Sequence, residues 1–210
     1  MMHPDTELRP VAESIGLGGF AKKDIPKGAI VYTMDPLEVV ISYKRKQSLP
    51  EAVNKILDKY SYIDARKRYI LSWDHAKFVN HSCEPNTITS GYGFEIAIRD
   101  IAAGEQITDD YGLLNIEHPM KCHCGSSVCR NWVNIEDSFG MANVWDQQIK
   151  NALSCFQSVD QPLIKLFPDC VPLSLMAYLT KKSRYKSVRT VLVKPQKKYD
   201  LSPHVLDYTI

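Results

Sequence analysis

Residues 77–86 read KFVNHSCEPN, and this stretch decides how the rest of the chain is interpreted. Asparagine, serine and proline favour turns, because their side chains cap nearby backbone groups or restrict φ. Taken alone, the ten residues are therefore compatible with an ordinary capped turn. Their significance comes from two other segments, one on each side of them.

The upstream segment is GLG at residues 16–18, followed by a Lys-Gly pair at residues 27–28. The downstream segment, residues 104–112, reads GEQITDDYG. A single G-x-G is more often a turn than a ligand loop, and an isolated Asp-Tyr-Gly is uninformative. The three segments together specify about ten positions at compatible separations, which makes coincidence improbable.

In identity, order and separation, the three segments resemble the SET-domain protein lysine methyltransferases. A C-x-C-x4-C run at residues 122–129 resembles the post-SET zinc segment of that family. The resemblance covers about residues 8–132. It implies a SET domain at 8–113 with an insert at about 42–75, and a post-SET zinc segment at 114–135. A C-terminal extension at 136–210 would be helical at its start and end in a basic tail.

The fold class implied by the resemblance is mostly β, of the SET-type β-clip kind. Short curved sheets would surround a pseudo-knotted C-terminal segment, with an inserted helix and a helical C-terminal extension. The residue patterns agree with many short strands, because residues 8–40 are punctuated by Gly and Pro turn signals. A hairpin is predicted around the turn at 91–93, where apolar residues alternate from Phe94 to Ile98.

Two helices are predicted from periodicity. Residues 50–60 carry apolar side chains at helical spacing after a Ser-x-x-Glu capping-box pattern that begins at Ser48. A second helix of about 15 residues is predicted from the apolar face that runs from Met141 to Phe156. A short strand is predicted over 107–111.

The resemblance implies S-adenosylmethionine as methyl donor. Glycines suit its pocket because backbone without a side chain can approach a ligand closely. At position 77 the family usually has Arg where this chain has Lys, which does not offer the same bidentate contact with a carboxylate. Trp132 has two open interpretations, a cover over the adenine and a core tryptophan. The implied cofactor-binding residues are Gly16, Leu17, Gly18, Lys77, Asn80, His81, Tyr111 and Trp132.

Tyr111 is the catalytic residue that the resemblance implies, since its hydroxyl would orient the methyl group and the target amine. The alternative is a buried tyrosine that merely satisfies its hydroxyl. A lysine amine has an unperturbed pKa of about 10.4, so the site must favour its neutral form. The family has Phe or Tyr two residues before this tyrosine, where the chain has Asp109. If Asp109 faces the substrate, an ionised carboxylate would attract the ammonium and oppose its deprotonation.

A further tyrosine belongs to the inserted region in the family. Tyr60, Tyr62 and Tyr69 are equal candidates for it on sequence alone.

Zinc requires four ligands, and Cys122, Cys124 and Cys129 supply three. The resemblance implies Cys83 as the fourth ligand of one structural zinc ion, with His123 as the next candidate. Disulfides are disfavoured because the sequence shows no secretory signal. The two remaining cysteines, at 155 and 170, are expected to be core thiols.

The charge of the chain is asymmetric. The segment 181–198 holds eight Lys or Arg and no acid, whereas the other 18 bases face 24 acids, a net charge of −6. A basic tail of this kind can bind nucleic acid or a nucleosome, although a solvated basic face or a loose terminus is the commoner explanation. No stretch has the ~18 apolar residues of a membrane helix, so we expect an intracellular protein with no membrane contact.

These observations favour an enzyme that transfers methyl groups to lysine side chains of a protein substrate, either a histone or another protein. The alternative is a catalytically silent SET-like module with zinc that binds a protein or nucleic acid through its basic tail. Cofactor binding discriminates between the two hypotheses.

Overall fold

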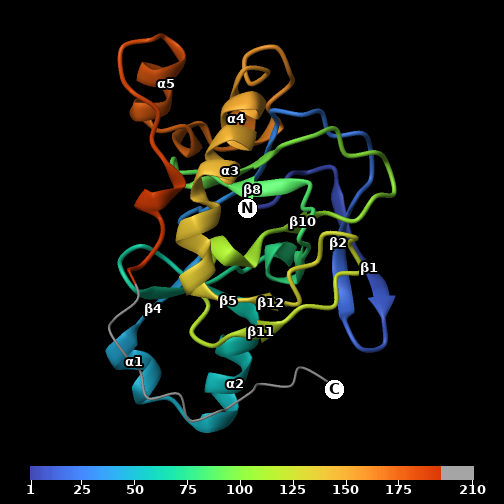
Figure 1. Cartoon of the computed structure of the whole chain (residues 1–210), viewed down its shortest axis with the longest axis vertical. Coiled ribbons are helices and arrows are strands. Elements are labelled where there is room, and N and C mark those ends of the chain that lie inside the picture. The colour runs from blue at the N-terminus through green and yellow to red at the C-terminus, as the bar shows by residue number, and fades with distance from the viewer. Residues whose placement is uncertain (195–210) are drawn as a thin grey trace.

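The computed structural model describes residues 1–194, and over these residues the strands form five small sheets instead of one large one (Figure 1). Three sheets have two strands (β1-β2, β10-β7 and β11-β12), and two have three (β3-β9-β8 and β4-β6-β5). The mostly β class is confirmed. The strands are β1 (Thr6–Ala12), β2 (Gly16–Ala21), β3 (Ile30–Thr33), β4 (Val39–Ser42), β5 (Ser61–Ile63), β6 (Arg68–Leu71), β7 (Asn80–His81), β8 (Thr87–Thr89), β9 (Phe94–Ala97), β10 (Thr108–Asp109), β11 (Met120–Lys121) and β12 (Trp132–Val133).

The helices fall into the insert and the C-terminal extension, both of which the fold-class prediction included. Short 3-10 turns occur at His75–Phe78, Tyr111–Leu113, Pro168–Cys170 and Val188–Thr190. Within residues 1–194, no helix is both long and apolar enough to cross a membrane. The α-helices are α1 (Tyr43–Gln47), α2 (Glu51–Tyr60), α3 (Ile135–Leu153), α4 (Pro162–Leu166) and α5 (Leu173–Leu179).

The helix predicted at 50–60 is present as α2, but its expected start signal is wrong. Ser48 ends α1 and its hydroxyl donates to the carbonyl of Arg45 at 2.8 Å. It makes no capping bond to α2, which begins after Pro50 without a side-chain cap. On the apolar face only Leu57 is buried, while Val53 and Ile56 are 40% and 55% exposed.

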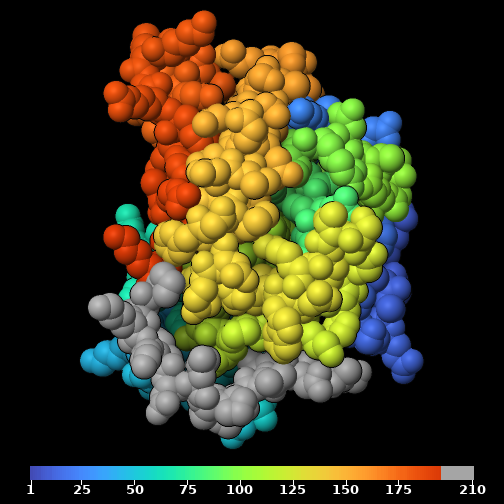
Figure 2. Space-filling view, viewed as in Figure 1, coloured from blue at the N-terminus to red at the C-terminus, as the bar shows by residue number. Residues whose placement is uncertain are grey.

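The central sheet β3-β9-β8 confirms the predicted hairpin, because β8 and β9 pair antiparallel. Its apolar side chains are packed by α3, which crosses one face of the molecule beside the C-terminal segment (Figures 1 and 2). Trp145 and Ile149 of α3 share one core cluster with Phe94 and Ile96 of the sheet. The C-terminal extension is therefore continuous with the core.

The helix α3 is longer than predicted, with 19 residues. It begins at Ile135, after Asn134, whose side chain accepts a hydrogen bond from the Asp137 amide at 2.8 Å. This N-cap satisfies an amide that has no partner within the helix. The predicted apolar face is buried at Trp145, Ile149 and Leu153, whereas Val144 is exposed.

The predicted strand at 107–111 is shorter than expected. Only Thr108–Asp109 form a strand, β10, which pairs in parallel with β7. The chain then turns, and Tyr111 opens a 3-10 turn in place of ending a strand. This parallel pair places the NHSC motif directly beside the Asp-Tyr motif. The pseudo-knotted threading itself stays a prediction.

The first part of the basic segment is attached to α3. Asp146 is 8% exposed and accepts hydrogen bonds from Tyr185 Oη, Ser187 Oγ and the Val188 amide. Val188 and Leu192 belong to the main core cluster. The interpretation of this segment as a loose terminus is therefore wrong up to residue 194, and residues 195–198 lie outside the described residues.

Candidate functional site

The predicted G-x-G loop lies against the NHSC motif. Gly16 has φ +86°, which glycine adopts without strain, and it opens β2. The Asn80 side-chain Nδ2 donates to the carbonyl of Leu17 at 3.0 Å. A Cβ added to Gly18 would lie 2.7 Å from Gln106 Nε2 and 3.0 Å from Asn80 Nδ2. The structure therefore brings Leu17, Gly18 and Asn80 together.

Two other predicted cofactor residues lie at the edges of this region. Lys77, in the 3-10 turn before β7, directs its Nζ towards the carbonyls of Ser72 and Trp73, at 3.4 Å from each. Trp132 lies on β12 opposite Lys121 and is 42% exposed. The interpretation of Trp132 as a core residue is therefore wrong. Its role as an adenine cover stays a prediction.

Tyr111 is held by contacts at both its backbone and its hydroxyl. Its Oη donates to the Val79 carbonyl at 2.7 Å, and its amide donates to His81 Nδ1 at 3.3 Å. The His81 and Tyr111 ring centroids are 5.4 Å apart. On its other side, His81 Nε2 lies 3.4 Å from Cys83 Sγ. Burial lowers the pKa of His81, although Asp110 nearby opposes the shift. The imidazole therefore connects Tyr111 to the cysteine cluster.

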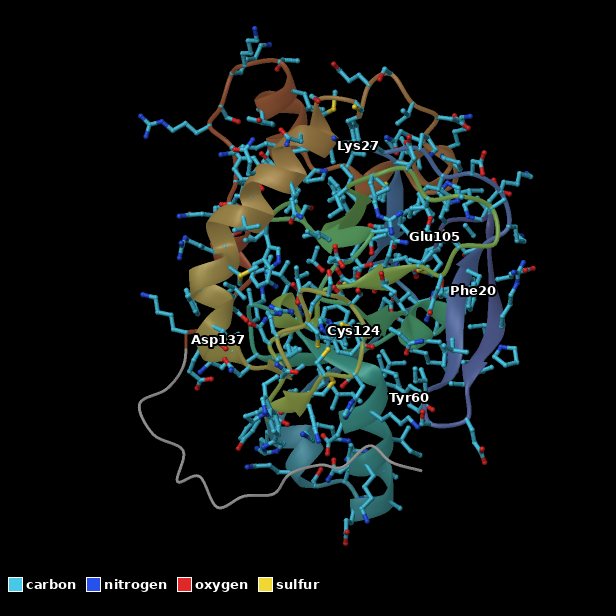
Figure 3. The ribbon with its side chains drawn as sticks, turned by 45° about the vertical axis from the view of Figure 1, so that its right-hand side comes forward. Phe20, Lys27, Tyr60, Glu105, Cys124 and Asp137 are labelled. Carbon is cyan, nitrogen blue, oxygen red and sulfur yellow. The ribbon has the colours of Figure 1, made fainter. Side chains whose placement is uncertain are left out.

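The four predicted zinc ligands form one cluster, in which all Sγ atoms of Cys83, Cys122, Cys124 and Cys129 lie within 4.8 Å of one another. Sulfur atoms gather around Cys124 in Figure 3. A tetrahedral ion with bonds of about 2.3 Å to sulfur requires sulfurs about 3.8 Å apart. Cys83 Sγ and Cys122 Sγ are separated by 3.8 Å. The thiols fit a zinc-sized ion, and His123 is not part of the cluster.

Backbone amides support the cluster. The amide of Arg130 donates to Cys83 Sγ at 3.3 Å, and the amide of Asn131 donates to Cys129 Sγ at 3.4 Å. Such bonds stabilise a thiolate in preference to a thiol. Cys155 and Cys170 lie outside the cluster. Cys170 is buried, as expected of a core thiol, whereas Cys155 is only partly buried.

Asp110 is a functional residue that the sequence analysis missed. It is 2% exposed, and Oδ1 accepts from Arg130 Nη2 at 2.5 Å, while Oδ2 accepts from Trp145 Nε1 at 3.0 Å. The ring of Trp145 covers Gly112 so closely that a Cβ there would lie 2.9 Å from Cη2. Asp110 thus joins the Tyr111 turn to the post-SET segment and to α3. The sequence offered two signals for this contact, the acid directly before Tyr111 and the arginine directly after Cys129.

The Asp109 side chain is buried against the central sheet. Its side chain is 2% exposed and contacts β8, because Thr89 Oγ1 donates to Asp109 Oδ2 at 3.3 Å. Burial raises the pKa of this carboxyl well above its ordinary range, and nearby Glu95 raises it further.

Of the three candidate tyrosines, Tyr62 is the one that contacts the central sheet. Burial raises its pKa, and its hydroxyl interacts with that of Tyr32 on the central sheet. Tyr69 is turned away, because its Oη donates to Glu117 Oε1. The ring of Tyr60 packs edge-on against Phe78 at 5.5 Å between centroids.

Comparisons with known proteins agree with this geometry. Residues 16–112 match the SET domain, so this part of the chain is similar to SET-domain proteins. A variant-silencing SET domain-containing protein of Plasmodium falciparum is 30% identical over 160 residues, which cover 67% of this chain and 6% of that protein.

Further relatives carry enzyme names. Histone-lysine N-methyltransferase 2D of Homo sapiens is 31% identical over 134 residues, 57% of this chain and 2% of the relative. Histone-lysine N-methyltransferase NSD3 of Mus musculus is 26% identical over 167 residues, 72% of this chain and 11% of the relative. The chain thus spans a small fraction of these relatives.

Proposed function

We propose that this chain transfers methyl groups from S-adenosylmethionine to lysine side chains of a protein. The observation that carries the proposal is the contact of Asn80 with the Leu17–Gly18 backbone, a short distance along β7 from the His81–Tyr111 contact. This arrangement offers a glycine-lined binding surface and a positioned phenol in one region. Relatives named as histone-lysine methyltransferases support the same chemistry.

The residues have distinct tasks in this proposal. Gly16, Leu17 and Gly18 present backbone to the cofactor, which supplies the methyl group when bound. Asn80 orients the loop, and Lys77, His81 and Trp132 complete the cofactor-binding set. Tyr111 positions the methyl group and a neutral lysine amine for direct transfer. Positioning alone accounts for large rate enhancements, so no covalent intermediate is needed.

The cysteine cluster is proposed to hold one structural zinc ion through Cys83, Cys122, Cys124 and Cys129. Soft thiolates in a closed set of four are typical of structural zinc. Bound zinc would attach the segment 114–135 to the NHSC motif. The domain boundaries at 8–113, 114–135 and 136–210 are proposed on the same basis.

The substrate is proposed to be a histone or another intracellular protein, because the relatives are named for histone lysines. The site chemistry requires only an accessible lysine side chain. No membrane partner is needed for it.

Cofactor binding tests the proposal. Calorimetry on the zinc-loaded chain is expected to show S-adenosylmethionine binding that Gly18→Ala and Asn80→Ala weaken ~10-fold or more, which is ~1.4 kcal/mol. Gly140→Ala is the matched control, because a Cβ at Gly140 meets nothing within 4 Å. Equal affinity in all variants would contradict the proposed pocket.

A second candidate function remains, that of a silent SET-like module. It is favoured by one observation, the acid-free segment 181–194 that Asp146 holds on α3. The bases of this segment are all exposed and could bind phosphate groups of nucleic acid. Absence of cofactor binding in the parent chain would favour this candidate. The exposed bases are Lys181, Lys182, Arg184, Lys186, Arg189 and Lys194.

A further inference from the structure

A row of polar side chains crosses the face of the central sheet that is turned away from α3. No function described so far uses this row. Tyr32 on β3 pairs with Glu95 on β9, which pairs in turn with Thr89 on β8. Directly paired residues of neighbouring strands point to the same face of a sheet. Asp109 on β10 extends the row, since its Oδ2 accepts from Thr89 Oγ1 at 3.3 Å.

One oxygen in this row lacks a donor. Oδ1 of Asp109 is buried and has no hydrogen-bond partner among the described residues. A buried polar atom left without a partner costs roughly 1–3 kcal/mol. In native proteins such an atom has an explanation, commonly a water molecule or a ligand. The oxygen is therefore available to a donor such as a water molecule or a ligand group.

Asp109 and Glu95 are neighbours on either side of Thr89, because Thr89 pairs with Glu95 across the sheet and bonds to Asp109 through its hydroxyl. Burial raises the pKa of Glu95 to about 7, and the pKa of Asp109 rises for the same reason and because Glu95 is near. Two neighbouring carboxyls with raised pKa values share a single proton over a range of pH. The charged and titratable groups around the pair and its tyrosine neighbours are Asp110, Tyr32, Tyr62, Glu38, Asp64 and the Met1 ammonium.

The pair is joined through the chain to the residue that we propose as catalytic. Asp109 precedes Tyr111 by two residues, and the Tyr111 hydroxyl bonds to Val79. Val79 and Tyr32 belong to one core cluster, against which Tyr62 packs. The row is also open to solvent, because Tyr62, Thr89, Glu95 and Tyr111 are each partly exposed.

We propose that Asp109 and Glu95 form a proton-sharing carboxyl pair that binds the ammonium group of the target lysine and accepts its proton. The inference rests on the proposed function. An N–H bond of the ammonium breaks, its electron pair stays on nitrogen, and an O–H bond forms on the ionised carboxylate of the pair. The neutral amine is then ready to take the methyl group from the sulfonium, which becomes a thioether. The pair afterwards releases its proton to water.

Carboxyl carbon-13 NMR on the full, zinc-loaded chain tests the pair without any methyl transfer. The probe is n-butylammonium, which resembles the end of a lysine, and n-butanol is the neutral control. We expect n-butylammonium alone to lower the pKa of Glu95, because a nearby cation stabilises the carboxylate. Asp109→Asn should also lower it by removing the second carboxyl. An unchanged Glu95 titration in both experiments would overturn the proposal.

A pH–rate profile with core histones as probe substrate separates this inference from the proposed function. Transfer should rise with pH through about 7, because only the ionised pair can accept a proton. Glu95→Gln should remove that rise while cofactor affinity stays unchanged, whereas Asp160→Asn at an exposed site should keep it. The same rise in Glu95→Gln contradicts the carboxyl pair. If the parent chain transfers no methyl group, that result contradicts the proposed function instead. The NMR titration of Glu95 then still tests the carboxyl pair.

Discussion

At the scale of single residues, the Asp109-Asp110-Tyr111 run connects three parts of the molecule. Successive side chains of a strand point to opposite faces, and the turn that follows redirects the next one. Asp109 therefore contacts Thr89, Asp110 bonds to Arg130, and Tyr111 bonds to the Val79 carbonyl. These three consecutive residues thus fix the positions of the proposed proton acceptor, the post-SET segment and the Tyr111 hydroxyl.

Tyr111→Phe should leave S-adenosylmethionine binding largely intact and slow methyl transfer by ~10²-fold or more, as loss of one preorganised hydrogen-bonding group does. Calorimetry and single-turnover transfer measure the two effects separately. Loss of the Tyr111–Val79 hydrogen bond alone is expected to cost only ~1 kcal/mol of stability. Undiminished transfer by the folded variant would remove Tyr111 from the catalytic role.

Asp110→Asn should destabilise the chain by ~3 kcal/mol, because it leaves the Arg130 charge without its buried partner. Urea unfolding at pH 7 measures the change. Asp160→Asn is the control, since its pair with Lys165 is exposed at both partners, and such pairs contribute ~0–1 kcal/mol. Equal unfolding midpoints for the two variants would show that Asp110 is not the connection described here.

At the scale of elements, the sequence predicted those with a long periodic signal. The alternation around Phe94 located β9, and the apolar face of α3 was identified although its first residues were not. α1 was missed, since five residues give too little periodicity. The strands β11 and β12 were missed as well, because two residues each carry no pattern.

The candidate site was predictable where motif residues themselves make the contact, as Asn80 and Gly18 do. It was not predictable where a long-range partner decides the outcome. Asp109 could face substrate or core on sequence alone, and only the tertiary position of β10 beside β8 places it next to Thr89. The partners of Asp110 likewise come from segments 20 and 35 residues away.

Folding of the segment 114–135 should depend on zinc, because β11 and β12 are too short to stabilise it. Elemental analysis should find about one zinc per chain, as four ligands define a single ion. Cys83→Ser should lower the zinc content as severely as Cys124→Ser. Cys170→Ser serves as control, since this thiol is outside the cluster. Full zinc content in Cys83→Ser would place the fourth ligand elsewhere.

At the scale of the whole molecule, the chain combines an acidic body with a basic segment that is attached to α3. Figure 2 shows α3, the post-SET segment and the described C-terminal residues side by side on one face. Because Val188 and Leu192 are part of the core, the basic segment cannot be deleted without loss of stability. Its charges have to be tested by substitution.

Replacing Lys181, Lys182, Arg184 and Lys186 with Gln should weaken nucleosome binding at low salt and reduce its salt dependence, if these bases contact phosphates. Methylation of a short peptide should be spared, since all four side chains are exposed. Fluorescence polarisation across a salt series measures the binding. Unchanged binding at low salt would indicate a merely solvated basic face.

The central claim, lysine methylation by this chain, is tested most directly by mass spectrometry. The zinc-loaded chain is incubated with S-adenosylmethionine carrying a labelled methyl group and with a cell extract, and labelled peptides are identified. We predict labelled methyl groups on lysine side chains with the parent chain and none above background with Tyr111→Phe. Absence of labelled lysine with a parent chain that is folded and zinc-loaded would contradict the account.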